Sequence, residues 1–135
     1  SWPHTLSPAT LPAMHALIIG GGIGGLTTAL ALHAAGIDCT VFEASAELRP
    51  LGVGINLQPH AVRELTELGL GERLAAAGVA TREFVYANRF GQEIWAEPRG
   101  LEAGYRWPQY SIHRGRLQVL LWNAAAERLG AARLR

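Results

Sequence analysis

The most regular hydrophobic pattern lies near the start of the chain. A short apolar run at residues 15–19 predicts a buried parallel strand, and the Ala- and Leu-rich stretch 26–35 predicts a helix that ends at Gly36. A second apolar run at residues 39–42 predicts another strand, with Glu43 at its end. Strand, helix and strand in this order predict the β-α-β unit of a Rossmann-like α/β fold.

Beyond this unit, turn residues divide the chain into shorter elements. Pro59 suits the first turn of a helix that Gly69 ends, and Gly91 suits the turn of a small β-hairpin. The pattern predicts, in order, a helix over 59–68, a short helix over 72–77, hairpin strands at 84–86 and 93–96, a loop over 99–109, a strand end at 111–113, a helix over 117–128 and the start of a further strand at 133–135. Residues 1–13 contain three prolines and are predicted to be a disordered leader.

Residues 20–25 (GGGIGG) fit the pattern G-x-G-x-x-G between the first strand and the first helix. In this setting Gly20 allows a tight turn, Gly22 lets the backbone approach a pyrophosphate, and Gly25 lets helix and strand pack closely. Glu43 lies eighteen residues after Gly25, where an acid binds a ribose 2′-hydroxyl and would repel a 2′-phosphate. The pattern therefore predicts an adenine dinucleotide other than NADP in this site, and it leaves FAD and NAD both open.

Composition bears on other functional classes. The 135 residues carry a formal net charge of +1, so neither nucleic acid nor a membrane surface is predicted as a partner. The single Cys39 predicts a reducing, cytoplasmic location. The stretch 12–37 is free of charge, but its glycine cluster argues against a membrane span, and no Lys or Arg precedes it as in a signal peptide. The five histidines show no metal-binding spacing, so no metal site is predicted.

Two later segments carry a family resemblance. Residues 44–59 (ASAELRPLGVGINLQP) and 111–117 (SIHRGRL) resemble segments of class A flavin-dependent aromatic monooxygenases, the para-hydroxybenzoate hydroxylase type. The stretches LGVGINLQP, EPRG and PQYSIHRG are most similar to members that act on phenazine carboxylates. The resemblance covers about residues 14–129. It implies that residues 14–135 are the N-terminal part of an FAD-binding domain.

The resemblance also implies roles for single residues. The glycine loop would hold the FAD pyrophosphate, and Glu43 with Ala44 would bind the adenosine ribose. Val53 and Gly54 would lie near the ribityl and isoalloxazine groups. Arg114, a permanent planar donor, would reach the ribityl or pyrophosphate region. The alternative for Arg114, and equally for an assisting arginine at position 49, is a surface ion pair. The predicted cofactor-binding residues are Gly20, Gly22, Ile23, Gly24, Gly25, Glu43, Ala44, Arg49, Val53, Gly54 and Arg114.

For the whole enzyme, the resemblance implies that NAD(P)H reduces FAD and that O2 then hydroxylates a small aromatic or phenazine-like substrate. None of the residues present suits a general acid or base, so no catalytic residue is predicted. Two alternatives stay open: an NAD-dependent dehydrogenase, and a non-catalytic dinucleotide-binding module. The family's later FAD-binding segments and substrate domain are not among these 135 residues. The parallel sheet is therefore predicted to be incomplete, and the isolated chain is expected to bind FAD weakly or not at all and to self-associate through unpaired strand edges.

Overall fold

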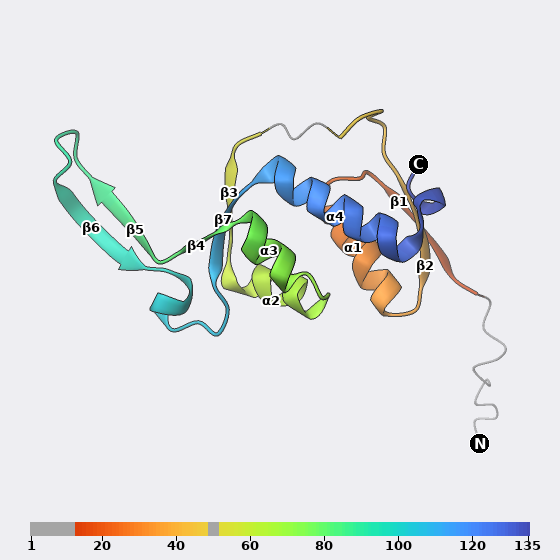
Figure 1. Ribbon diagram of the computed structural model, residues 1–135, viewed down its shortest axis with the longest axis horizontal. Coiled ribbons are helices and arrows are strands. Elements are labelled where there is room, and N and C mark those ends of the chain that lie inside the picture. Colours follow the sequence, from red (N-terminus) through yellow and green to blue (C-terminus); the bar gives the residue numbers. More distant parts are fainter. Residues whose placement is uncertain (1–12, 49–51) are drawn as a thin grey trace, which may run out of the picture.

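The computed structural model describes residues 13–48 and 52–135, and these form a mixed α/β fold (Figure 1). Strands β1 (His15–Ile19) and β2 (Asp38–Phe42) pair in parallel, and helix α1 (Ile23–Ala34) connects them. Gly36 ends α1 as predicted, since it adopts φ 76° and its N–H donates to the His33 carbonyl at 3.0 Å. The predicted Rossmann-like β-α-β unit is confirmed, whereas the predicted leader, residues 1–13, lies almost entirely outside the described residues.

One prediction for β1 is wrong, because this strand is not buried. Leu17 and Ile19 are 65% and 83% exposed, while Ala16 and Ile18, which alternate with them, pack toward a small core around Ala29. Side chains of a strand alternate between the two faces of its sheet. Helix α1 covers one face of β1 and leaves Leu17 and Ile19 exposed on the other.

The parallel sheet continues beyond β2 at the chain's last residues. Leu134 forms a parallel bridge with Val41, and the Arg135 N–H donates to the Val41 carbonyl at 2.9 Å. The Glu43 N–H in turn donates to the Arg135 carbonyl at 2.6 Å. A further strand therefore starts beside β2 where the pattern predicts it, after the short 3₁₀ helix η3 (Ala131–Arg133).

A second, antiparallel sheet has strand order β3-β7-β4, and the sequence predicts only its middle strand. Strand β7 (Gln109–His113) is this predicted strand, and it starts inside the predicted loop, which also contains the 3₁₀ helix η2 (Gly100–Ala103). Strands β3 (Gly54–Leu57) and β4 (Val79–Thr81) have four and three residues, too few for a clear alternating pattern. Pairing with β7 stabilises both of them.

Three further helices pack against strand β7 of the antiparallel sheet: α2 (Pro59–Glu67), α3 (Gly71–Ala77) and α4 (Arg114–Leu129). Helix α4 also packs along α1. Pro59 is the first residue of α2, and Gly69 follows the end of the helix, as predicted. The common core joins α1 and α4 through fully buried leucines four residues apart, namely Leu26, Leu30, Leu117 and Leu121. Each such leucine contributes about 1.5–3 kcal/mol through burial. The position of α4 against α1 is therefore strongly fixed.

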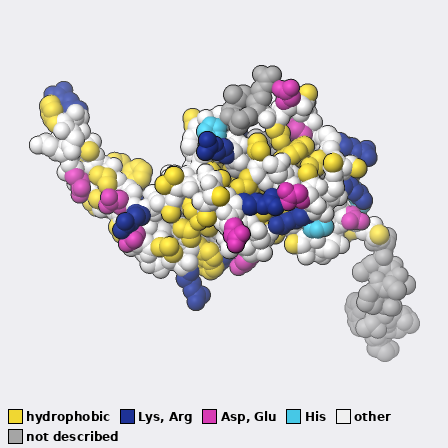
Figure 2. Space-filling model, viewed as in Figure 1, with side chains coloured by type: hydrophobic (Ala, Val, Ile, Leu, Met, Phe, Trp, Pro, Cys, Tyr) yellow, Lys and Arg dark blue, Asp and Glu magenta, His cyan; other side chains and the backbone are white. Residues whose placement is uncertain are grey.

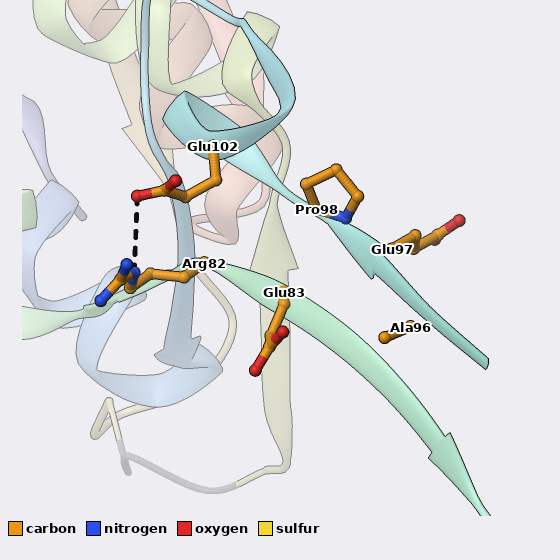
Figure 3. Close-up of a pocket in the computed structure, with 6 residues that line it drawn as sticks. All are labelled: Arg82, Glu83, Ala96, Glu97, Pro98 and Glu102. Carbon is orange, nitrogen blue, oxygen red and sulfur yellow. Dashed lines mark ion pairs between the residues drawn. The ribbon is translucent and has the colours of Figure 1, made fainter. Parts of the chain in front are cut away.

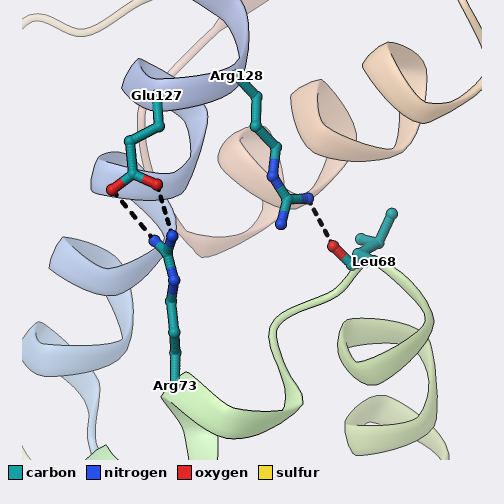
Figure 4. Close-up of polar contacts among 4 residues, drawn as sticks. All are labelled: Leu68, Arg73, Glu127 and Arg128. Atoms are coloured by element: carbon teal, nitrogen blue, oxygen red, sulfur yellow. Dashed lines mark hydrogen bonds and ion pairs between the residues drawn. The ribbon is translucent and has the colours of Figure 1, made fainter.

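Polar contacts hold the far end of α4 to the helices beside it (Figure 4). The Arg73 guanidinium on α3 pairs with the Glu127 carboxylate at 2.5 Å. The Arg128 Nη1 donates to the Leu68 carbonyl, at the C-terminus of α2, at 2.5 Å. The second contact satisfies one of the carbonyl groups that a helix end leaves without an internal donor.

The predicted hairpin is present as β5 (Glu83–Ala87) and β6 (Glu93–Pro98), with Gly91 at φ 79° in its turn. It projects from the rest of the chain (Figure 1), and apolar side chains lie at the surface along it (Figure 2). The Tyr86 and Trp95 rings stack with centroids 6.4 Å apart, and they remain 51% and 57% exposed.

No helix in residues 13–48 and 52–135 combines the length and the apolar character needed to cross a membrane.

Candidate functional site

The glycine loop joins the end of β1 to the start of α1. Gly20 adopts φ 108°, a left-handed conformation that favours glycine, and its N–H donates to the Phe42 carbonyl at 2.7 Å. A methyl group at Gly25 would overlap the Gly20 carbonyl oxygen and approach Ile18 Cγ2 to 3.3 Å. The loop can therefore fold this tightly only with glycine at both ends.

The middle of the loop is open. Among the described residues, a Cβ atom added at Gly22 or Gly24 would meet no atom within 4 Å. The first helical hydrogen bond of α1 runs from the Leu26 N–H to the Gly22 carbonyl at 3.0 Å, and the N-cap residue, Gly22, has no side chain that could cap the helix. The preceding N–H groups, those of Ile23, Gly24 and Gly25, thus have no acceptor within the helix. Free N–H groups at the positive end of a helix dipole, with open space beside them, fit the pyrophosphate of a dinucleotide.

Glu43, at the end of β2, lies against this loop. Its Oε1 accepts a hydrogen bond from the Ser45 N–H at 2.9 Å, and its Oε2 accepts one from the Gly21 N–H at 2.6 Å. These two backbone donors lower the pKa of the Glu43 carboxyl, and Ser45 has the larger effect of the two. Each carboxylate oxygen has a second lone pair, so an ionised Glu43 can still accept hydrogen bonds from ribose hydroxyls. Ala44 is exposed beside it.

Sequence reasoning missed Gly21, which occupies a variable position of the motif. Gly21 is buried, and a Cβ atom there would lie 2.9 Å from Trp122 Cζ3 and 3.0 Å from Glu43 Oε2. Its carbonyl oxygen accepts a hydrogen bond from Gln118 Nε2 at 2.9 Å. Gln118 and Trp122 are four residues apart on α4, a spacing that places them on one helix face. That spacing is visible in the sequence, but the contact with a loop about a hundred residues away is not.

Three other predicted residues, Val53, Gly54 and Arg114, meet where β3, β7 and α4 come together. Pairing of β3 with β7 places Gly54 opposite His113. The Arg114 N–H donates to the Val53 carbonyl at 3.1 Å. Gly52 adopts φ 129°, and a Cβ atom there would lie 3.6 Å from Arg114 Cβ. Two segments sixty residues apart in sequence, both of which carry the family resemblance, are therefore in direct contact.

Of the two arginines predicted to assist the cofactor, the structure describes Arg114 but not Arg49. Arg114 is exposed, and among the described residues no carboxylate forms an ion pair with it, so the surface ion pair considered as the alternative is not seen there. Arg49 lies outside the described residues, and its predicted role stays a prediction.

Helix α4 begins three residues earlier than the pattern predicts because His113 caps it. The His113 Nδ1 accepts a hydrogen bond from the Gly115 N–H at 3.1 Å. Histidine is not among the preferred N-cap residues, so the residue pattern does not indicate this start. Arg114 is thus the first residue of α4, and Gln118 lies one turn after it on the same face. One helix therefore joins the Arg114 side of the site to the glycine loop.

A separate cavity of about 460 Å³ lies at the base of the hairpin and contains none of the predicted residues (Figure 3). Three carboxylates line it, those of Glu83, Glu97 and Glu102, and Arg82 pairs with Glu102 at 3.5 Å. Glu97 in turn pairs with Arg99, so both arginines beside the cavity are already paired with carboxylates and are poorly placed to bind phosphate. The open glycine loop, although it is not an enclosed cavity, is the better candidate for a dinucleotide.

Two curated proteins show what the chain is similar to in sequence. The chain is 60% identical over 120 residues to the phenazine 1,6-dicarboxylic acid hydroxylase PhzS of Lysobacter antibioticus, a match that covers 88% of this chain and 30% of that protein. It is 40% identical over 121 residues to the 3-amino-4-hydroxybenzoate 2-monooxygenase of Streptomyces cremeus, covering 85% of this chain and 31% of that protein.

Two solved structures also match most of the chain. The Klebsiella pneumoniae HpxO structure, complexed with FAD and uric acid, matches 90% of this chain and 30% of its own length, with a TM-score of 0.70 and 30% identity. The tetrameric form of 2-methyl-3-hydroxypyridine-5-carboxylic acid oxygenase matches 93% of this chain and 32% of its own length, with a TM-score of 0.74 and 28% identity.

The chain thus spans about 30% of the length of the curated relatives described above. The family model described as "FAD binding domain" matches residues 13–131, nearly the whole chain. The chain belongs to this family of FAD-binding domains, found in flavin-dependent monooxygenases.

Proposed function

We propose that the whole protein is a flavin-dependent monooxygenase that hydroxylates a small aromatic, phenazine-like substrate with NAD(P)H and O2. The 60% identity to a phenazine hydroxylase and the 40% identity to an aminohydroxybenzoate monooxygenase support this proposal. The observation that carries it is the joined site, in which α4 connects an open phosphate loop to the Val53–Arg114 contact. Bound FAD supplies the electron transfer and oxygen activation, and the chain supplies its binding and orientation.

Within this proposal, the adenosine ribose binds at Glu43 beside Ala44, because an ionised carboxylate there keeps lone pairs for hydroxyl groups. The pyrophosphate binds at the N–H groups of Gly22, Ile23, Gly24 and Gly25, with Gly20 providing the turn. The ribityl and flavin end extends toward Val53, Gly54 and Arg114. A guanidinium is suited to phosphate or ring oxygens in that position. Arg49 is proposed to assist.

The two alternatives are less well supported. An NAD-dependent dehydrogenase shares the β-α-β unit, but the family match and the FAD-containing structural relative favour FAD. A non-catalytic dinucleotide-binding module would not need a region that binds the flavin group. The contact between Arg114 and Val53 supports such a region, because it lies at the start of α4, the helix that also contacts the glycine loop. We also propose a cytoplasmic protein that binds neither nucleic acid nor membranes, and an isolated 135-residue chain that self-associates through its exposed strands.

The test is a spectrum followed by an activity assay on the purified full-length protein. The proposal predicts flavin absorbance at one FAD per chain, and NAD(P)H oxidation that rises when a phenazine carboxylate is added and yields a hydroxylated product. Bound NAD without flavin would favour the dehydrogenase. Bound FAD without oxidation of NADH or NADPH in the presence of aromatic substrates would favour the non-catalytic module.

A further inference from the structure

Both polar backbone groups of Gly21, within the glycine loop, are held by side chains. The N–H donates to Glu43 Oε2 at 2.6 Å, and the carbonyl oxygen accepts from Gln118 Nε2 at 2.9 Å. Gly21 is buried, and the Trp122 ring occupies the space into which a side chain would project. Glu43 thus fixes the peptide plane before Gly21, and Gln118 fixes the peptide plane after it.

The second of these planes also contains the Gly22 N–H. A peptide group is planar and trans, so its carbonyl and its N–H point in opposite directions. A hydrogen bond from Gln118 that holds the Gly21 carbonyl toward α4 therefore directs the Gly22 N–H away from α4. Gly22 is the residue whose Cβ position is open and that precedes α1, where a pyrophosphate fits.

We propose that Gln118 is a positioning residue for FAD, which sets the direction of the Gly22 N–H through its hydrogen bond to Gly21. This inference rests on the proposed FAD-binding function. Without the Gln118 donor, the Gly21 carbonyl is buried with no partner, and the loop is free to rotate this peptide plane to reach another donor. Because Arg114 lies one turn earlier on α4, Gln118 also sets the spacing between the arginine and the phosphate loop.

The experiment compares two variants of the full-length protein, Gln118→Met and Asn123→Ala. Methionine keeps the length of the side chain and removes the donor, while Asn123 is an exposed residue of the same helix and serves as the matched control. FAD is titrated into each apoprotein, and unfolding by urea is measured in parallel. Loss of one hydrogen bond predicts about five- to tenfold weaker FAD binding for Gln118→Met and wild-type affinity for Asn123→Ala.

A double-mutant cycle with Glu43→Gln separates positioning from a purely structural role. If Gln118 and Glu43 act on the same backbone segment, their combined loss of FAD affinity is smaller than the product of the single losses. Independent, multiplying effects would overturn the inference. So would a Gln118→Met variant that unfolds at lower urea but binds FAD as tightly as the wild type. A wild-type protein that binds no FAD would instead overturn the proposed function itself.

Discussion

The two halves of the candidate site differ in how firmly the chain holds them. At the glycine loop, Gly21 is buried, and both its N–H and its carbonyl are bonded to side chains. At the other half, Val53 is 73% exposed, and the Arg114 side chain has no carboxylate partner among the described residues. The half proposed to bind the adenosine and pyrophosphate groups is therefore preorganised, while the half proposed to bind the ribityl and flavin groups would have to order its exposed side chains on binding. Preorganised groups lose less entropy when a ligand binds.

The strongest way to break this comparison is to disturb the packing under the preorganised half. In Gly25→Ala, the new methyl group would overlap the Gly20 carbonyl oxygen, which is backbone and cannot move aside cheaply. We expect a loss of about 3 kcal/mol in the free energy of unfolding, the upper part of the range for overpacking, together with loss of FAD binding. Urea unfolding of the full-length protein measures the first effect and FAD titration the second.

Gly24→Ala is the matched control for this change, because a Cβ atom at Gly24 meets no atom within 4 Å. Alanine in a helix is up to about 1 kcal/mol more favourable than glycine, so this variant should be as stable as the wild type or more stable. Equal unfolding midpoints for the two variants would contradict the packing assigned to Gly25.

The same comparison explains how much the sequence could predict. The β-α-β unit, its glycine loop and Glu43 are close together in the chain, and their order follows from local pattern and turn chemistry. Contacts made by distant segments were not predictable from one sequence: Gln118 and Trp122 on Gly21, and β3 on β7. Only the family resemblance pointed to the Val53–Arg114 contact. It assigned both residues to one cofactor but gave no physical reason for their proximity.

Arg114→Ala tests the less ordered half. The side chain is exposed, so stability should be unchanged, whereas the loss of a charged hydrogen-bond donor predicts about 10- to 100-fold weaker FAD binding. Arg116→Ala is the control, because Arg116 is also exposed on α4 but, two positions away, lies on a different side of the helix. If both variants lower the FAD affinity equally, Arg114 acts only through net charge.

Glu43→Gln has a smaller expected effect, which depends on pH. The Ser45 and Gly21 N–H groups lower the pKa of the folded Glu43 carboxyl below that of an unfolded glutamate, about 4.3. The stability that Glu43 contributes is therefore present above that value and is lost as the pH falls through the lower folded pKa. The variant should bind FAD several-fold more weakly and show a flatter loss of stability below about pH 4. Glu93→Gln, on the exposed hairpin, should leave both properties unchanged.

The most direct test of the account is FAD titration of full-length Gly22→Val. Gly22 has φ −77° and ψ −178°, an extended conformation that valine adopts readily, and its Cβ position is open. The variant should therefore fold with its helices intact, as circular dichroism and urea unfolding would show, and should bind no detectable FAD because the side chain fills the pyrophosphate space. A folded Gly22→Val protein that still binds one FAD per chain would show that the glycine loop does not hold the cofactor.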